Sequence, residues 1–189
     1  LATIYQKLAK TVPHKHPEYI NKAKRLHQLA AETDKNNPIF QLNYAYFLHQ
    51  RGNIDAAFPY YIRSREIDPR MLEASYNLGD IYRRKKDLNK AKEYYQYVYE
   101  KNPSYNRVNL LLGSIYISQQ LPKKAFVHLK KDYLLNPNKE NAILNFAAIS
   151  HELQQYKNAA YLYEELLKQH PKNEQKIIHN YIESLINSD

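Results

Sequence analysis

The sequence contains no cysteine and no tryptophan, and only 3 of its 189 residues are glycine. Without cysteine there is no disulfide, no thiolate nucleophile and no cysteine-ligated zinc. The scarcity of glycine leaves no Gly-rich loop that could hold a phosphate group. Long apolar runs are also missing, since none approaches the roughly 18 residues that a membrane-spanning helix needs. These absences exclude several classes of protein but leave the compartment open between cytoplasm and periplasm.

Residue patterns that carry catalysis are missing as well. The 8 histidines are scattered along the chain, and no nucleophile stands in a recognisable pattern with a general base. We therefore predict a non-enzyme with no catalytic residue, no cofactor and no metal site. The chain begins Leu1-Ala2-Thr3, without an initiator Met or a signal-peptide pattern. We expect it to be a piece of a longer protein, which could carry an enzymatic domain elsewhere.

The charge is strongly positive, with 28 Lys and Arg against 19 Asp and Glu, a net charge of +9. Such a surface could attract acidic proteins, nucleic acid or anionic lipid. A biased codon pool explains the same balance, because Lys, Asn, Tyr and Ile are all abundant here. Both interpretations stay open at this stage.

Five alanines are spaced 34 residues apart, each inside an amphipathic stretch: Ala23, Ala57, Ala91, Ala125 and Ala159. A period of about 34 residues is typical of a stacked array of helix–turn–helix units. With these alanines at position 20 of each unit, the chain 1–189 becomes one array with repeats 4–37, 38–71, 72–105, 106–139 and 140–173. The first repeat is degenerate, as a terminal repeat often is.

Other columns fall into the same register. In every repeat after the first, position 32 holds a helix-breaking proline, in the set Pro69, Pro103, Pro137 and Pro171. Position 8 holds small residues that let two helices approach closely, namely Ala45, Gly79, Gly113 and Ala147. Position 24 holds large packing residues, namely Tyr61, Tyr95, Leu129 and Tyr163.

The segment Asn77-Leu78-Gly79, followed by Tyr82, Ala91, Tyr95 and Pro103, resembles the tetratricopeptide repeat. This resemblance recurs along nearly the whole chain. It implies an all-α fold, a right-handed superhelical solenoid of antiparallel helix pairs.

Two departures from the family pattern stand out. The family's Trp at position 4 is replaced by Gln41, Ser75, Asn109 and Ile143, which we expect to weaken that packing point. Asp132 lies at position 27, where a small residue is usual. We expect it to reach solvent or a basic partner such as Lys130 or Lys131, or else the second helix of that repeat to be shifted.

After the last full repeat, residues 174–186 place apolar side chains at 177, 178, 181, 182, 185 and 186. This is a helical stripe. The segment is either a C-terminal capping helix or the first helix of a truncated sixth repeat.

The resemblance also implies where a partner lies. In this family the first helix of each repeat lines a concave groove, and ligands touch positions 2, 5, 6, 9, 12 and 13. The candidate partner-binding residues are Asn43, Tyr46, His49, Tyr76, Asn77, Asp80, Arg83, Arg84, Arg107, Asn141, Asn145 and His151. We expect a protein–protein interaction scaffold that binds an extended peptide or a helix of another protein.

Arg83 and Arg84 could receive acidic groups of that partner. Equally, they could only oppose the dipole at the end of their helix. The asparagines of position 6 could pair with a peptide backbone or tie neighbouring helices together. A heat-shock chaperone tail is not the expected ligand, because the family's basic residue at position 5 is replaced by Leu42, Tyr76, Leu110 and Leu144.

Two other functions stay open. One is a nucleic-acid-binding helical repeat that uses the basic surface, above all the run Arg83–Lys86, and its binding would weaken steeply with salt. The strict period of 34 argues against a base-reading repeat. The other is a self-assembly module of a larger protein, formed through repeat 5 and residues 174–186.

Overall fold

The computed structural model of the protein describes residues 1–11, 16–169 and 174–188, and within them it contains eleven helices and no strand. The predicted all-α class is therefore confirmed. The chain divides into two compact units, Leu1–Tyr97 and Val98–Asp189. None of the described helices is both long enough and apolar enough to cross a membrane. Pro171, the last of the predicted closing prolines, lies outside the described residues.

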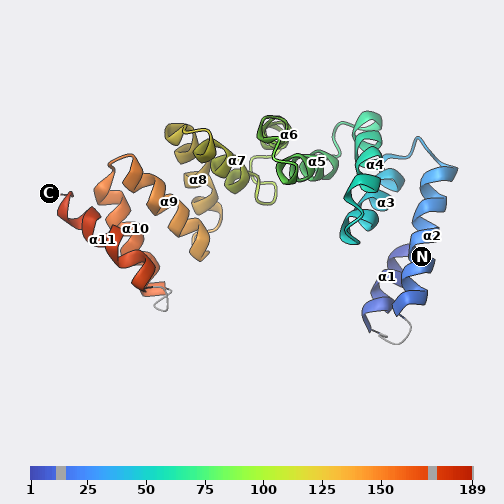
Figure 1. The fold of residues 1–189 in the computed structure, drawn as a ribbon, viewed down its shortest axis with the longest axis horizontal. Coiled ribbons are helices and arrows are strands. Elements are labelled where there is room, and N and C mark those ends of the chain that lie inside the picture. The colour runs from blue at the N-terminus through green and yellow to red at the C-terminus, as the bar shows by residue number, and fades with distance from the viewer. Residues whose placement is uncertain (12–15, 170–173, 189) are drawn as a thin grey trace. The chain divides into compact units, whose positions relative to one another are not determined.

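The first unit consists of antiparallel helix pairs (Figure 1). Its helices are α1 (Ala2–Thr11), α2 (His16–Thr33), α3 (Pro38–Gln50), α4 (Ile54–Ile67), α5 (Leu72–Arg84) and most of α6 (Leu88–Lys101). Asn37 begins α3, since its side chain accepts hydrogen bonds from the amides of Ile39 and Phe40 and Pro38 follows it. Each first helix is thus followed by a second helix that packs back on it.

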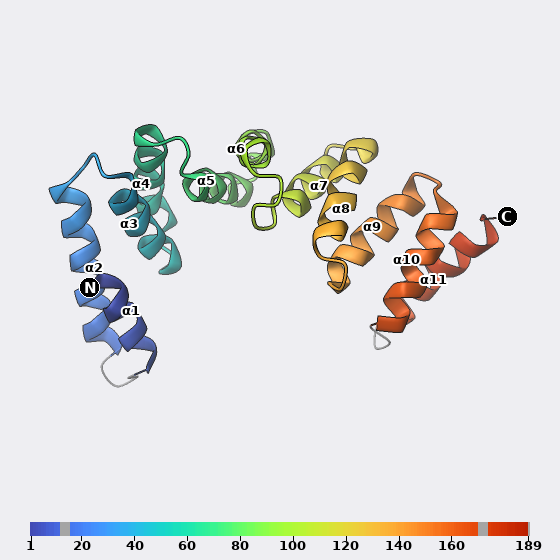
Figure 2. The same ribbon diagram turned by 180° about the vertical axis from the view of Figure 1, so that it is seen from behind.

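The second unit repeats this arrangement (Figure 2). Its helices are α7 (Val108–Ser118), α8 (Pro122–Leu135), α9 (Glu140–Glu152), α10 (Tyr156–Gln169) and α11 (Glu174–Ile186). The helices α3, α5, α9 and α11 all begin at position 1 of the 34-residue register. In contrast, α7 begins two residues late, because Asn106 adopts a left-handed conformation with φ of 44°.

In the four helix pairs whose turns the structure describes, the second of the three turn residues lies in the left-handed region. This column, position 15, holds Gly52, Lys86, Gln120 and Gln154, with φ between 57° and 78°. At each turn the next amide bonds back to a carbonyl five residues earlier, as Asp87 does to Tyr82. Glycine suits this conformation best, yet three of the four turns use a longer side chain. The backbone hydrogen bond therefore holds this residue in the left-handed conformation, whichever side chain it carries.

The alanine column marks the tightest contacts between helices. All five alanines are fully buried. A Cβ atom added to Gly79 would lie 2.7 Å from the ring of Tyr95, and one added to Gly113 would lie 2.6 Å from Leu129. The small residues at position 8 therefore allow close helix approach, as predicted.

Two of the three polar residues at position 4 donate hydrogen bonds to backbone carbonyls. Gln41 is buried and donates to the carbonyl of Ala31 at 2.8 Å. Asn109 is also buried and donates to the carbonyl of Pro103 at 2.6 Å. These carbonyls lie near the ends of the preceding segments and need a partner when they are buried. Both side chains therefore have hydrogen-bond partners, whereas the buried Ser75 hydroxyl has none among the described residues. The expected weakness of this packing point stays a prediction.

Candidate functional site

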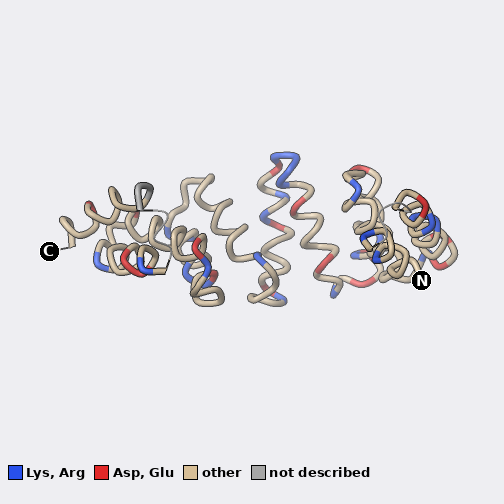
Figure 3. Tube along the Cα trace, turned by 90° about the horizontal axis from the view of Figure 1, so that it is seen from below, with Lys and Arg blue, Asp and Glu red and all other residues tan. Residues whose placement is uncertain are grey.

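Eight of the twelve candidate residues lie on the first helices α3 and α5 of the first unit. Asn43, Tyr46, Arg83 and Arg84 are exposed, and His49, Tyr76, Asn77 and Asp80 are half-buried. Charges of both signs are interspersed along the helices, with the densest basic run at the turn between α5 and α6 (Figure 3). The surface that these helices present is therefore polar and aromatic, and its charges are mixed.

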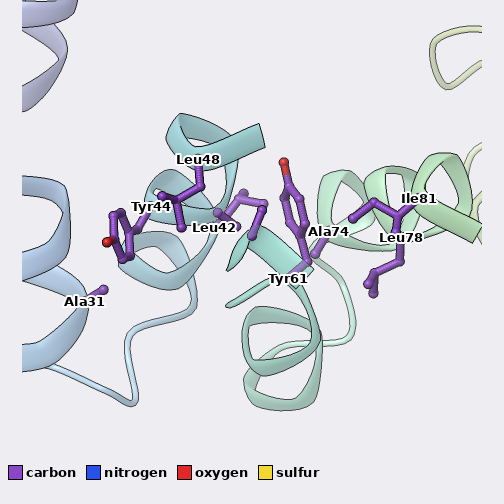
Figure 4. Packing of buried hydrophobic residues seen from close by; sticks show 10 residues of the cluster. Ala31, Leu42, Tyr44, Leu48, Tyr61, Ala74, Leu78 and Ile81 are labelled. Atoms are coloured by element: carbon purple, nitrogen blue, oxygen red, sulfur yellow. The ribbon is translucent and has the colours of Figure 1, made fainter. Parts of the chain in front are cut away.

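Tyr61, on the second helix α4, reaches from the core to this surface. Its ring is fully buried and stands between Leu42 and Ala74 (Figure 4). Its hydroxyl lies 3.3 Å from Nδ1 of His49. Burial raises the pKa of Tyr61, and the nearby Glu73, Tyr46 and Asp80 act in the same direction. The phenol therefore stays protonated and can donate to the imidazole.

His49 is held as a neutral ring. Burial lowers its pKa, Arg84 lowers it further, and Asp80 opposes the shift. A histidine with a lowered pKa is uncharged at neutral pH. These interactions also show that Tyr46, His49, Asp80 and Arg84 lie close enough to influence one another or Tyr61. Residues from two successive first helices thus meet around one buried tyrosine.

Asp80 is the centre of a second set of contacts. The hydroxyl of Tyr95, on α6, donates to Oδ1 of Asp80 at 2.6 Å. Arg83 donates to the same oxygen through Nη2 at 3.3 Å. The ring centroid of Tyr76 lies 5.7 Å from that of Tyr95. A fully buried tyrosine therefore fixes the carboxylate that in turn orients Arg83.

The two candidate asparagines of this unit, Asn43 and Asn77, are not part of the contacts around Tyr61 and Asp80. Asn77 donates to the carbonyl of Glu73 at 2.8 Å, within its own helix, so it does not tie two helices together. Asn43 lines a separate pocket of about 280 Å³ with Leu26, His27 and Phe40, next to α1 and α2. The structure brings Tyr46, His49, Tyr76, Asp80, Arg83 and Arg84 together, and places Asn43 beside a different cavity.

The remaining four candidates belong to the second unit. Arg107 and Asn141 line a pocket of about 550 Å³ that also contains Asp132. Asn145 is half-buried one turn further along α9. His151 lies at the other end of α9, with Nε2 3.5 Å from the Glu183 carboxylate of α11. The pocket and His151 are therefore two separate places on this unit.

Asp132 departs from two of our three expectations, and the basic residues that act on its carboxylate are Lys139 and Arg107. It is only 6% exposed, so it does not reach freely into solvent. Its carboxylate accepts a hydrogen bond at 3.3 Å from Nδ2 of Asn136, the residue that follows α8. The second helix is not shifted either, because α8 begins and ends at the same register positions as α4, α6 and α10. Burial raises the pKa of Asp132, while Lys139, Arg107 and the Asn136 bond oppose the shift.

Sequence reasoning missed the hydrogen bonds of Tyr61 and Tyr95. We assigned both to packing from their place in position 24, which is correct for their rings. Their hydroxyls, however, hold His49 and Asp80 on the exposed side of the first helices. The signal was present in the choice of Tyr over Leu or Phe, because a buried tyrosine hydroxyl usually has a hydrogen-bond partner.

Residues 72–105 and residues 142–173 match family models of the tetratricopeptide repeat. The first of these segments has the same bounds as our third predicted repeat. A UDP-N-acetylglucosamine--peptide N-acetylglucosaminyltransferase of Giardia intestinalis is 28% identical over 131 residues. The match covers 69% of this chain but only 9% of that protein, so the chain corresponds to a small part of its relative.

Several solved structures share the fold. YrrB, described as a TPR protein with an unusual peptide-binding site, has a TM-score of 0.77 and 21% identity over 86% of this chain and 83% of its own. MamA of Desulfovibrio magneticus RS-1 has a TM-score of 0.70 and 19% identity over 90% and 96% of the two chains. For pilF of Pseudomonas aeruginosa the values are 0.68 and 19%, over 89% and 76%.

Proposed function

Since this chain is built of tetratricopeptide repeats, a scaffold for protein–protein interaction, we propose that it binds a partner peptide on the first-helix surface of α3 and α5. The observation that carries the proposal is the pair of buried tyrosines, Tyr61 and Tyr95, whose hydroxyls hold His49 and Asp80 in place. Side chains fixed before binding lose less conformational freedom when a ligand arrives. This surface therefore combines polar groups with a rigid support.

The chemistry of this surface favours a peptide that carries an acidic group. Arg84 is exposed beside the neutral ring of His49, and Arg83 has donors left after its contact with Asp80. Arginine binds carboxylates in a two-pronged geometry. Tyr46 is 43% exposed and Tyr76 is half-buried, so both can cover apolar parts of the peptide. YrrB, a relative in fold, is described as having a peptide-binding site, which supports a peptide as the occupant.

The same contacts make nucleic acid a weaker candidate. Several cations near this surface already pair with carboxylates, as Lys85 does with Asp55 at 3.3 Å and Arg83 does with Asp80. Acidic groups also lie within the surface, namely Glu73 and Asp80. A phosphate backbone would meet repulsion from both. The proposed role is non-catalytic binding, and no residue of this surface is assigned a chemical step.

A peptide array followed by fluorescence anisotropy tests the proposal. Arg84→Glu should weaken the selected peptide about tenfold or more, because it places a negative charge where an acidic group is received. Lys24→Glu is the matched control, since it makes the same charge change on the exposed side of the second helix α2. The control should keep the affinity within about twofold.

Two results would place the function elsewhere. Equal losses in Arg84→Glu and Lys24→Glu would show that only the net charge matters. Single-stranded RNA that binds tightly at low salt and loses most of its affinity at physiological salt would favour the nucleic-acid alternative. Light scattering on the same samples would detect self-assembly, the third alternative, as a mass above 22.5 kDa that depends on concentration.

A further inference from the structure

The 550 Å³ pocket of the second unit, which we call the Asp132 pocket, has an unusual origin. It is lined by the start of α7, the end of α8 and the start of α9: Asn106, Arg107, Leu110, Asp132, Asn136, Lys139, Glu140, Asn141 and Ala142. Asn106 and Arg107 would be helical if α7 began at position 1, as α3, α5 and α9 do. Because Asn106 is left-handed, α7 begins only at Val108, and Asn106 and Arg107 line the pocket from the loop before it.

The carboxylate of Asp132 is buried with little compensation. Its residue is more than nine-tenths buried, and the contact with Nδ2 of Asn136 at 3.3 Å is the hydrogen bond of its side chain. Within the described part of the chain it has no ion pair closer than 4.0 Å. Arg107 and Lys139 line the same pocket, but both are exposed to solvent. A buried carboxylate of this kind is costly unless a cation or several donors reach it.

The lining indicates which kind of group fits. A guanidinium or ammonium group would pair with the Asp132 carboxylate, and the side-chain oxygens of Asn136 and Asn141 could accept its remaining hydrogens. Leu110 and Ala142 offer apolar contact for the methylene chain of a lysine or arginine. A metal ion fits less well, because the described residues contain no group of three or more His, Cys, Asp or Glu side chains that could hold one.

We propose that the Asp132 pocket binds a lysine or arginine side chain of a partner peptide, and that Arg107 and Lys139 at its rim bind an acidic residue next to it. This assignment rests on the proposed peptide-binding function and adds a second, basic specificity to it. Arg107 and Asn141 are at position 2 of their repeats, a column that we predicted to touch the ligand. The preferred sequence is therefore a mixed-charge pair.

The test uses small probes, so that it does not depend on finding the natural partner. The ¹⁵N-labelled protein is titrated with Nα-acetyl-arginine amide and, separately, with Nα-acetyl-citrulline amide, which has the same shape without the charge. Arginine amide should shift the amide signals of Asn136, Lys139 and Asn141, and citrulline amide should not. Asp132→Asn should weaken arginine amide at least tenfold, whereas Glu164→Gln on α10 should leave it unchanged.

Three results would overturn the assignment: equal binding of citrulline amide, unchanged binding in Asp132→Asn, or shifts confined to residues outside the pocket. A thermal melt of Asp132→Asn shows that the variant is folded. The acidic neighbour is tested with the dipeptides acetyl-Asp-Arg-amide and acetyl-Asn-Arg-amide. The Asp form should bind about threefold more tightly, and Arg107→Gln should remove the difference; equal affinities would refute that part.

This result is separable from that of the first-helix surface. If arginine amide binds the pocket while Arg84→Glu keeps its peptide affinity, the pocket stands and the proposed α3–α5 surface fails. If Arg84→Glu loses affinity while arginine amide shifts no pocket signal, the surface stands and the pocket assignment fails.

Discussion

The repeats 72–105 and 106–139 share a close contact between their two helices but differ in the side chains around it. In both, a glycine of the first helix faces a large residue of the second, Gly79 against Tyr95 and Gly113 against Leu129. The hydroxyl of Tyr95 donates a hydrogen bond to Asp80, whereas Leu129 has no polar group. The residue that corresponds to Asp80 is Ser114, whose hydroxyl donates to the carbonyl of Leu110 in its own helix. One buried position thus separates a polar, fixed surface from an apolar one.

The same two repeats also differ at position 27. Val98 occupies it in the first and is fully buried, whereas Asp132 occupies it in the second. Only the repeat with Asp132 has a shortened first helix and a pocket beside that residue. The comparison teaches that equal helix spacing does not imply equal surface chemistry, because single columns of the core decide it.

The largest expected effect comes from making the first of these repeats resemble the second. Tyr95→Leu should lower the free energy of unfolding by about 2–4 kcal/mol, because it removes a buried ring and leaves space behind. Tyr95→Phe keeps the ring and should cost only about 1 kcal/mol, the share of the hydroxyl. Urea denaturation measures both. Equal losses in the two variants would mean that the bond to Asp80, and not the ring, carries the whole effect.

A smaller effect is expected at Asp132. Burial raises its pKa, so the folded protein holds this proton more tightly than the unfolded chain does. Wild-type stability should therefore fall as the pH rises from the ordinary Asp pKa of 3.8 through the raised folded value. Asp132→Asn removes this dependence and should gain about 1 kcal/mol at pH 7, or roughly 2–4 °C in Tm. Thermal melts at pH 4 and pH 7 measure it, with Glu164→Gln as a neutral control.

The smallest effects are expected at the turns. Lys86 and Gln120 are left-handed non-glycine residues, one in each of the two compared repeats. Replacing either with glycine should stabilise the protein by about 0.5 kcal/mol, since the relief of strain exceeds the entropy that glycine loses. Gly52→Ala is the reverse change and should destabilise by about 1 kcal/mol. A gain at one turn and a loss at the other would show that their side chains have contacts that outweigh the backbone.

The helical fold could be predicted because the same residue types recur every 34 residues along the sequence. Five alanines, four prolines and four small residues at fixed spacing define the helix pairs without any knowledge of long-range contacts. The candidate surface was only partly predictable. The register placed His49, Asp80 and Arg84 on first helices, but which hydroxyl would reach which of them depends on the distance between helices. A sequence does not contain that distance.

The Asp132 pocket shows a second limit. Position 27 marked Asp132 as unusual, yet its environment depends on Asn106, which is 26 residues away in the sequence. The left-handed conformation of Asn106 is a local feature that makes α7 begin two residues late. Nothing in the periodic pattern encodes it, because a repeat register assumes that each first helix begins at the same place.

Tyr61 and Tyr95 have a consequence for how this protein can change its partner. The ring of each tyrosine is buried in the core, and its hydroxyl contacts a residue of the first-helix surface. Under the proposed function, a substitution at either tyrosine alters folding and recognition at once, so selection cannot adjust one without disturbing the other. Arg84 is exposed and does not pack in the core, so its substitution should affect folding little. New specificities should therefore arise first at residues like Arg84. His49 and Asp80, which the tyrosines hold, should change less among descendants of this chain.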